Sequence, residues 1–184
     1  AMCGTINDLS VMGARPLGIS LAMVIEEGFP VKDLKKIIDS IDKVSKETRI
    51  PIVTGDTKVT HKGKIDKIEI TTAGVGLAEK VIENSGLKPG DKIIASGGLG
   101  EHGVVILAYR FDYRTKIKTD SQPVFKEIQS ILKFVTAAKD PTRGGVAANI
   151  TEMAAKSNVR IILEDEKIPF KKEVRAISNL LGID

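Results

Sequence analysis

Three short segments of the chain place a carboxylate beside groups that suit a phosphate or a metal ion. They are Asn7-Asp8, then Gly55-Asp56-Thr57-Lys58 after an apolar run, and Asp140-Pro141-Thr142-Arg143-Gly144-Gly145 before a helical pattern. Magnesium prefers hard oxygen ligands and usually takes one or two carboxylates together with phosphate oxygens and waters. If the fold brings the three segments together, they predict one site for a magnesium nucleotide.

Cations and open backbone groups accompany these carboxylates. Arg143 offers a planar fork that suits phosphate, and Lys58 offers a compact point charge. Gly144 and Gly145 leave backbone N–H groups open at a helix start, where the helix dipole favours an anion. Each segment taken alone also fits a structural role, either as a turn or as a helix cap, so only the combination indicates chemistry.

A glycine-rich segment, residues 97–103, is a weaker candidate. Its glycines permit close approach of a ligand, but it lacks the Lys-Ser or Lys-Thr ending of a P-loop and the dinucleotide fingerprint. His102 in this segment is a candidate polar contact, although a solvent-facing histidine is the commoner interpretation. One cysteine and two distant histidines do not make a zinc ligand set.

The elements that must position these residues alternate along the chain. The patterns predict strands at 17–25, 50–54 and 67–77 and an amphipathic helix at 30–47. A turn-rich stretch at 84–90 predicts a boundary between two domains, 1–86 and 87–184. Beyond it the patterns predict strands at 92–96 and 159–163 and helices at 104–109, 124–135, after the Asp140 segment, and at 170–181. The fold class is therefore α/β or α+β.

Composition limits the function classes. Among 184 residues, 28 basic and 24 acidic side chains are interspersed, and aromatic residues make up 4% without any tryptophan. This pattern is typical of a solvated surface and not of a nucleic-acid-binding stripe. Cys3 is the only cysteine, so no disulfide can form within one chain. No signal peptide is visible, and the longest apolar run, 19–25, is too short to span a bilayer. We expect a soluble cytoplasmic protein that binds neither nucleic acid nor membrane.

Taken in order, the motifs resemble those of the HypE hydrogenase-maturation family, and the resemblance covers essentially the whole chain. The Asn-Asp-Leu element is shared with aminoimidazole ribonucleotide synthetase and selenophosphate synthetase, whereas the Gly55–Val59 and Asp140–Gly145 forms are much more specific to HypE. The motifs that carry the resemblance are Gly4-Thr5-Ile6-Asn7-Asp8-Leu9-Ser10, Gly13-Ala14-Arg15-Pro16-Leu17, Glu26-Glu27-Gly28-Phe29-Pro30, Val53-Thr54-Gly55-Asp56-Thr57-Lys58-Val59, Gly97–Gly103 and Asp140–Gly145.

The resemblance implies a two-domain synthetase-like fold, with an N-terminal α/β domain whose sheet pairs in a homodimer and a C-terminal α/β sandwich. It implies binding of ATP with Mg²⁺. It also implies ATP-dependent dehydration of a carbamoyl group on a C-terminal cysteine to a thiocyanate, which supplies the cyanide ligand of a nickel–iron hydrogenase. The partners it implies are the carbamoyl-transferring protein HypF and the HypC–HypD scaffold complex.

Carried over residue by residue, the resemblance assigns metal-binding roles to Asp8, Asp56 and Asp140. It makes Lys58 the candidate catalytic residue at the activated oxygen, because cations stabilise charge on a transferring phosphoryl group. The candidate nucleotide contacts are Asn7, Asp8, Asp56, Thr57, Lys58, Asp140, Thr142, Arg143, Gly144 and Gly145.

The chain departs from the family pattern at both ends. The family's first segment, which bears an aspartate-containing strand, and its cysteine-bearing tail are not visible. We therefore expect a fragment in which both domains are incomplete and which turns over ATP weakly or not at all. Two alternatives stay open: a related ATP-dependent synthetase of the aminoimidazole ribonucleotide or selenophosphate type, and a non-catalytic nucleotide-binding dimerisation module.

Overall fold

The computed structural model describes residues 1–142 and 144–181, which fall into two compact units. Unit 1 comprises Ala1–Ile82 and Pro123–Asp140, and unit 2 comprises Glu83–Gln122 and Pro141–Asp184. Both units are discontinuous in sequence, because the segment 123–140 returns to unit 1. The division into continuous domains, 1–86 and 87–184, stays a prediction.

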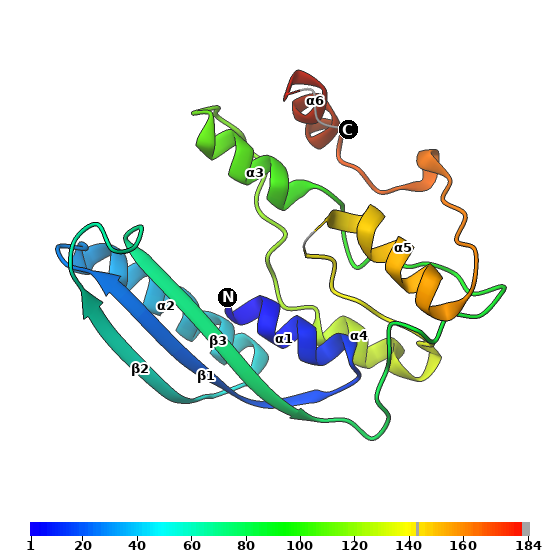
Figure 1. Ribbon diagram of the computed structural model, residues 1–184, viewed down its shortest axis with the longest axis horizontal. Helices are drawn as coiled ribbons and strands as arrows, with labels where there is room; N and C mark the ends of the chain where they lie inside the picture. Colours follow the sequence, from blue (N-terminus) through cyan, green and yellow to red (C-terminus); the bar gives the residue numbers. More distant parts are fainter. Residues whose placement is uncertain (143, 182–184) are drawn as a thin grey trace. The chain divides into compact units, whose positions relative to one another are not determined.

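Unit 1 is built on a three-stranded sheet with the order β2-β1-β3 (Figure 1). The central strand β1 pairs in parallel with β2 and antiparallel with β3. Helix α2 provides the crossover between the two parallel strands, which a hairpin cannot join. The elements of unit 1 are α1 (Met2–Val11), β1 (Arg15–Glu26), α2 (Val31–Thr48), β2 (Ile52–Thr60), β3 (Ile68–Leu77), α4 (Phe125–Ile131) and the 3-10 helix η1 (Leu132–Phe134).

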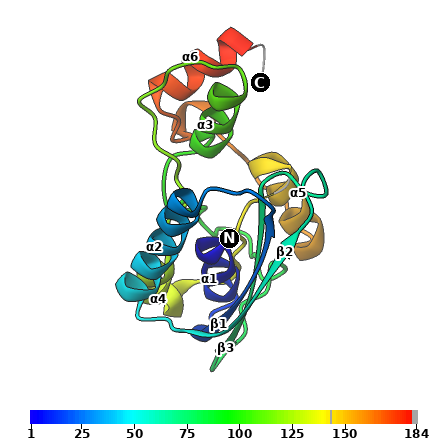
Figure 2. The same ribbon diagram turned by 90° about the vertical axis from the view of Figure 1, so that its left-hand side faces the viewer.

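Helices α1 and α2 cover one face of this sheet (Figures 1 and 2). The buried core joins Met2 and Ile6 of α1 to Ile19 of β1 and to Ile50 before β2. Met2 and Ile6 are four residues apart, so they lie on one stripe of the helix and face the sheet together. We call the opposite face of the sheet the outer face; no element of the described part of unit 1 packs on it.

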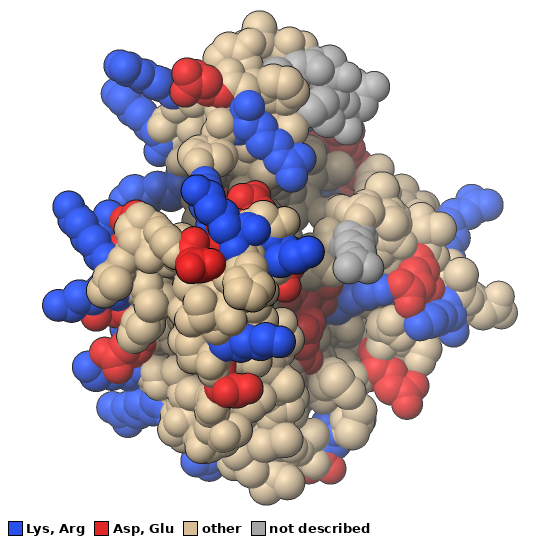
Figure 3. All heavy atoms as spheres, turned by 60° about the vertical axis from the view of Figure 1, so that its left-hand side comes forward, with Lys and Arg blue, Asp and Glu red and all other residues tan. Residues whose placement is uncertain are grey.

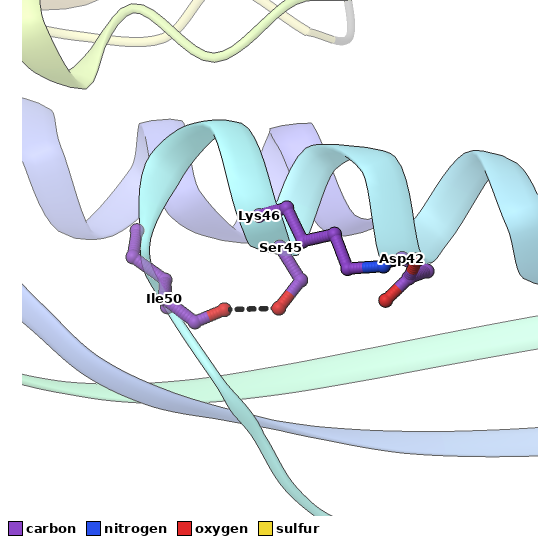
Figure 4. Close-up of polar contacts among 4 residues, drawn as sticks. All are labelled: Asp42, Ser45, Lys46 and Ile50. Atoms are coloured by element: carbon purple, nitrogen blue, oxygen red, sulfur yellow. Dashed lines mark hydrogen bonds and ion pairs between the residues drawn. The ribbon is translucent and has the colours of Figure 1, made fainter.

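The turn between α2 and β2 is fixed by a pair of hydrogen bonds (Figure 4). The Ser45 hydroxyl donates to the carbonyl of Ile50 at 2.7 Å, and the Ile50 N–H donates to the carbonyl of Ser45 at 3.2 Å. Between them, Arg49 adopts the left-handed conformation that ends many helices. These contacts fix the turn that leads into β2.

Unit 2 contains α3 (Glu101–Arg110), α5 (Gly145–Ser157), the 3-10 helix η2 (Asp165–Lys167) and α6 (Lys172–Leu181). The buried Glu101 carboxylate at the start of α3 pairs with Lys171, just before α6, at 2.8 Å. A Cβ atom on Gly98 would lie 2.5 Å from that carboxylate, and one on Gly100 would lie 2.9 Å from Val174. The glycine-rich segment 97–103 therefore makes room for side chains of its own unit.

Two predicted strands are wrong. Residues 92–96 and 159–163 have no strand structure, because neither segment has a hydrogen-bonded neighbouring strand in the described part of the chain. The predicted strands at 17–25 and 67–77 and the predicted helices are confirmed, with ends that shift by a few residues. Within residues 1–142 and 144–181, no helix is long and apolar enough to cross a membrane.

Candidate functional site

Two of the three predicted loops are regular structure. Asn7 and Asp8 lie inside helix α1, and Asp56, Thr57 and Lys58 lie inside strand β2. Gly-Asp-Thr is typical of a turn, but β2 pairs with the long strand β1 through this stretch as far as Thr60. Strand pairing overrides local preference here, since strand propensity depends mainly on context.

Strand register places Asp56 and Lys58 on the outer face. Ala22 of β1 pairs with Asp56 on one side and with Thr71 of β3 on the other. Val24 pairs in the same way with Lys58 and Glu69. Since side chains alternate along a strand, Asp56 and Lys58 project on the same side, about 6.6 Å apart along β2.

A shallow hollow of about 210 Å³ surrounds Asp56 on this face. Small and hydroxyl-bearing side chains form it, so space and oxygen atoms lie together beside the carboxylate. Ser20 keeps its hydroxyl within the sheet, where it donates to the carbonyl of Ala73 at 3.4 Å. The lining residues are Ser20, Leu21, Ala22, Thr54, Gly55, Asp56, Thr71 and Ala73.

The side chains of Asp56 and Lys58 are exposed, and neither side chain has a hydrogen-bond or ion-pair partner among the described residues. The Asp56 carboxylate fits Mg²⁺, which takes one or two carboxylates and completes its shell with waters and phosphate oxygens. The part of the chain that the structure describes has no group of three or more His, Cys, Asp or Glu side chains that could hold a metal alone. The chemistry of this face therefore suits a metal that arrives with phosphate.

Helix α1 places Asn7 and Asp8 differently. The Asn7 side-chain oxygen accepts the Val124 N–H at 2.9 Å, which ties α1 to the start of α4. Asp8 is exposed on α1 and has no partner in the described chain. Since α1 packs on the face of the sheet opposite to the Asp56 side chain, the sheet of unit 1 separates these two carboxylates.

Residues 140–142 form a loop ahead of α5, as predicted. Asp140 is half-buried in unit 1 and is engaged in a polar interaction, whereas Thr142 is exposed in unit 2. Arg143 lies outside the described residues. Gly144 and Gly145 have φ values of 75° and 59°, and no described side chain caps α5, so its first N–H groups stay open to an anion.

The hydroxyls near Asp56, those of Ser20, Thr54 and Thr71, were not predicted from the sequence. Alternation within each strand was visible in the sequence. The register that sets Ser20 beside Thr54, and Ala22 beside Thr71, arises only from pairing between strands.

Charged side chains elsewhere are mostly dispersed. Basic and acidic side chains are interspersed on the face shown in Figure 3. Helix α2 carries exposed ion pairs, such as Lys36–Asp33 and Lys46–Asp42. Exposed pairs of this kind contribute little to stability. Their dispersion is consistent with the expectation of a solvated surface.

Two family sequence models match this chain. Residues 1–78 match the N-terminal domain of AIR synthase-related proteins, and residues 88–183 match the C-terminal domain. The chain belongs to the AIR synthase-related family. The resemblance that the motifs indicated is confirmed at the level of its HypE branch by individual relatives.

Among these, a hydrogenase expression/formation protein of Methanocaldococcus jannaschii is 48% identical over 100% of this chain and 56% of its own length. The carbamoyl dehydratase HypE of Cupriavidus necator is 43% identical over 98% of this chain and 54% of its own length. The chain therefore spans about half the length of the curated relatives it matches.

Solved structures agree. The crystal structure of a HypE–HypF complex matches 100% of this chain and 63% of its own chain, with a TM-score of 0.94 at 40% identity. HypE in complex with ATP matches 100% of this chain and 57% of its own, with a TM-score of 0.94 at 34% identity. The predicted mixed α/β class is thereby confirmed.

Proposed function

We propose that the chain is part of an ATP-dependent carbamoyl dehydratase of nickel–iron hydrogenase maturation. The observation that supports this most is the exposed pair Asp56 and Lys58 beside a hydroxyl-lined hollow, in a chain of the HypE branch. A solved HypE relative holds ATP, so a phosphate-binding role for this face fits the family.

The proposed site takes its metal ligands from Asp56, Asp8 and Asp140. Asp56 has the most suitable surroundings, since hydroxyl oxygens and open space lie beside it. Because the sheet separates Asp8 from Asp56 within one copy, Asp8 would contribute to the site of the second copy in the proposed homodimer, and Asp140 would contribute in the complete assembly. The proposed nucleotide contacts are Asn7, Asp8, Asp56, Thr57, Lys58, Asp140, Thr142, Arg143, Gly144 and Gly145.

The proposed reaction removes the elements of water from a thiocarbamate. The amide oxygen attacks the γ-phosphorus of ATP, ADP leaves, and the phosphorylated oxygen becomes a leaving group. Loss of phosphate and of the nitrogen-bound protons then leaves a thiocyanate on the sulfur. Lys58 would stabilise the charge on the transferring phosphoryl oxygens, a role that cations fill throughout phosphoryl transfer. The Mg²⁺ ion would supply charge neutralisation at the phosphates.

The wider organisation belongs to the same proposal. The part of the outer face around Val53 and Val75 would pair in a homodimer, which leaves Asp56 and Lys58 open to the nucleotide. The C-terminal half, from residue 87, would complete an α/β sandwich after the N-terminal domain 1–86. The carbamoyl group would arrive from HypF on a cysteine at the C-terminus of the full-length protein. The cyanide group would leave to the HypC–HypD complex in the cytoplasm.

Nucleotide binding tests the site directly. Calorimetric titration of the chain with ATP and Mg²⁺ should give measurable affinity that weakens at least about tenfold in Asp56→Asn, because a metal-facing charge is lost. Asp39→Asn, an exposed change on α2, should bind as the wild type does. Unchanged affinity in all three of Asp8→Asn, Asp56→Asn and Asp140→Asn would remove the proposed site.

Turnover tests the reaction. In the full-length protein carrying a carbamoylated cysteine, Lys58→Met should slow formation of the thiocyanate by about 10²–10³-fold while ATP still binds. Mass spectrometry follows the loss of one water from the modified cysteine. The 184-residue chain alone should show little or no ATP turnover. Robust turnover by it would contradict the expectation that it is a fragment.

A further inference from the structure

The end of helix α3 gathers exposed aromatic side chains in a chain that has few. Both tyrosines and one of the five phenylalanines lie within five residues there. The exposed fractions are 82% for Tyr109, 59% for Phe111 and 50% for Tyr113. We call residues 109–118 the basic–aromatic surface.

The backbone holds these rings on a fixed scaffold. The Tyr113 N–H donates to the carbonyl of Ala108 at 2.8 Å, and the Asp112 N–H donates to the carbonyl of Tyr109 at 3.4 Å. Asp112 has a φ of 56°. This is the Schellman arrangement that ends a helix, so the rings stand on an ordered turn.

Beyond the turn, exposure alternates with a period of two. Arg114, Lys116 and Lys118 are exposed, while the residues between them, Thr115 and Ile117, are half-buried. This is the pattern of an extended chain with one side toward solvent. The far end is held in place, because the Thr119 hydroxyl lies 2.9 Å from Nδ1 of His102 on α3.

The main chain of residues 114–118 is open to pairing. Among the described residues, none makes a backbone–backbone hydrogen bond to it, and its one N–H contact is from Ile117 to the Thr115 hydroxyl at 3.1 Å. An extended segment with open N–H and C=O groups can accept a further strand.

Charge at this surface is unbalanced. Arg110, Arg114, Lys116 and Lys118 have no ion-pair partner in the described chain, and Asp112 is the only carboxylate between residues 109 and 118. Elsewhere six lysines of the described chain form ion pairs, including Lys167 with Glu164 at 2.7 Å. The surface therefore favours an acidic partner.

The open main chain favours one class of acidic partner. Cationic side chains two residues apart on an extended chain are spaced by about 6.6 Å, and carboxylates along one side of an extended peptide have the same spacing. A nucleic-acid strand offers phosphates but no peptide N–H and C=O groups, whereas an extended peptide can also pair with the open main chain of residues 114–118. Tyrosine, phenylalanine and arginine are also the residues enriched where proteins bind proteins.

We propose that the basic–aromatic surface binds an extended acidic segment of a partner protein. Carboxylates at alternate positions pair with Arg114, Lys116 and Lys118, and apolar groups of the segment pack on the rings of Tyr109 and Tyr113. This docking function is separate from the proposed dehydration chemistry.

Fluorescence anisotropy of the full chain with a short labelled peptide tests this. The probe has glutamate at alternate positions and leucine or glycine between them, and a matched probe has glutamine in place of glutamate. The glutamate probe should bind, and the glutamine probe should not. Arg114→Glu/Lys116→Glu should weaken binding about tenfold or more, because charge reversal replaces attraction by repulsion. Tyr109→Ala/Tyr113→Ala should weaken it about severalfold.

A control makes the same charge change elsewhere. Lys32→Glu/Lys35→Glu, both exposed on α2, should bind the glutamate probe like the wild type. Circular dichroism checks that each variant is folded. The proposal is overturned by equal weakening in the control or by absence of glutamate-probe binding. Tighter binding of a labelled oligo-dT than of the peptide also overturns it, in favour of a nucleic-acid surface.

Discussion

At the scale of single residues, a few residues other than glycine adopt the left-handed backbone conformation, which is unusual for Arg and Lys and commoner for Asp and Asn. Arg49, Lys67, Asp112 and Asn158 all have positive φ values, and two of them end helices directly: Arg49 ends α2 and Asn158 ends α5. A residue with a Cβ atom pays a steric cost in this region, which glycine avoids. The surrounding hydrogen bonds, such as those between Ser45 and Ile50, hold Arg49 there.

Replacing Arg49 by glycine should therefore stabilise the protein. The side chain is exposed, so little contact is lost, and relief of the left-handed strain should add about 0.5–1 kcal/mol to the free energy of unfolding. Urea unfolding measures the change. Arg49→Ala keeps a Cβ atom and should give no gain; an equal gain in both variants would argue against strain as the cause.

Cys3 offers a pH-dependent prediction. Burial raises the pKa of the Cys3 thiol, so the folded chain keeps this proton to higher pH than the unfolded chain does. The resulting stabilisation is fully present below the unfolded pKa and is lost as pH rises through the folded pKa. Urea unfolding at neutral and at strongly alkaline pH should show a larger loss in wild type than in Cys3→Ala. Parallel losses would show that other groups titrate instead.

At the scale of elements, the contact between α1 and β3 depends on a residue without a side chain. A Cβ atom on Gly74 would lie 2.8 Å from both Ile19 Cδ1 and Leu9 Cδ1, and 3.0 Å from Thr5 Cγ2. Close approach of the helix therefore requires glycine at this position of the strand.

Gly74→Val should reduce the free energy of unfolding by about 1–3 kcal/mol, because the larger side chain forces α1 away from the sheet. Gly4, in α1, is the matched control, since a Cβ atom there meets nothing within 4 Å. Gly4→Ala should be neutral or stabilise by up to about 1 kcal/mol through helix propensity. Chemical unfolding of both variants decides; a harmless Gly74→Val would mean that the packing adjusts.

Some helices and strands could be predicted from the sequence and others could not. Helix α2 and strand β3 were predictable because each carries its own period of apolar residues. The extent of β2 was not, because Gly55-Asp56-Thr57 has turn composition and becomes strand only by pairing with β1. The segment 92–96 shows the converse, since strand-like residues without a neighbour stay irregular. The motif could still be recognised despite both errors, because it depends on the residue types at positions 56 and 58 and not on their secondary structure.

At the scale of the whole molecule, the outer face of the sheet carries apolar side chains in the open. Val53 and Val75 flank Gly18 on this face, and each is 64% exposed. Under the proposed homodimer, a second copy would cover them, and burial of such surface is the main driving force for association.

Val75→Lys should therefore shift the protein toward monomer, because a charge would be buried without a partner. Val31 on α2 is 77% exposed, and Val31→Lys should leave the oligomeric state unchanged. Light scattering coupled to gel filtration gives the mass of each variant. A wild-type chain that is monomeric at all concentrations tested would count against the dimer through this face in the chain as it stands.

The strand order has a consequence for the rate at which amide protons exchange with solvent. β1 is hydrogen-bonded along both edges, whereas β2 is bonded along one edge only. Exchange should therefore be slow throughout β1, and fast at alternate amides of β2, whose outward-pointing N–H groups have no ladder partner. Asp56 and Lys58 thus lie on one of the two edge strands of the sheet, where alternate amides lack a ladder partner. Ligand binding on this face should therefore slow amide exchange more in β2 than in β1.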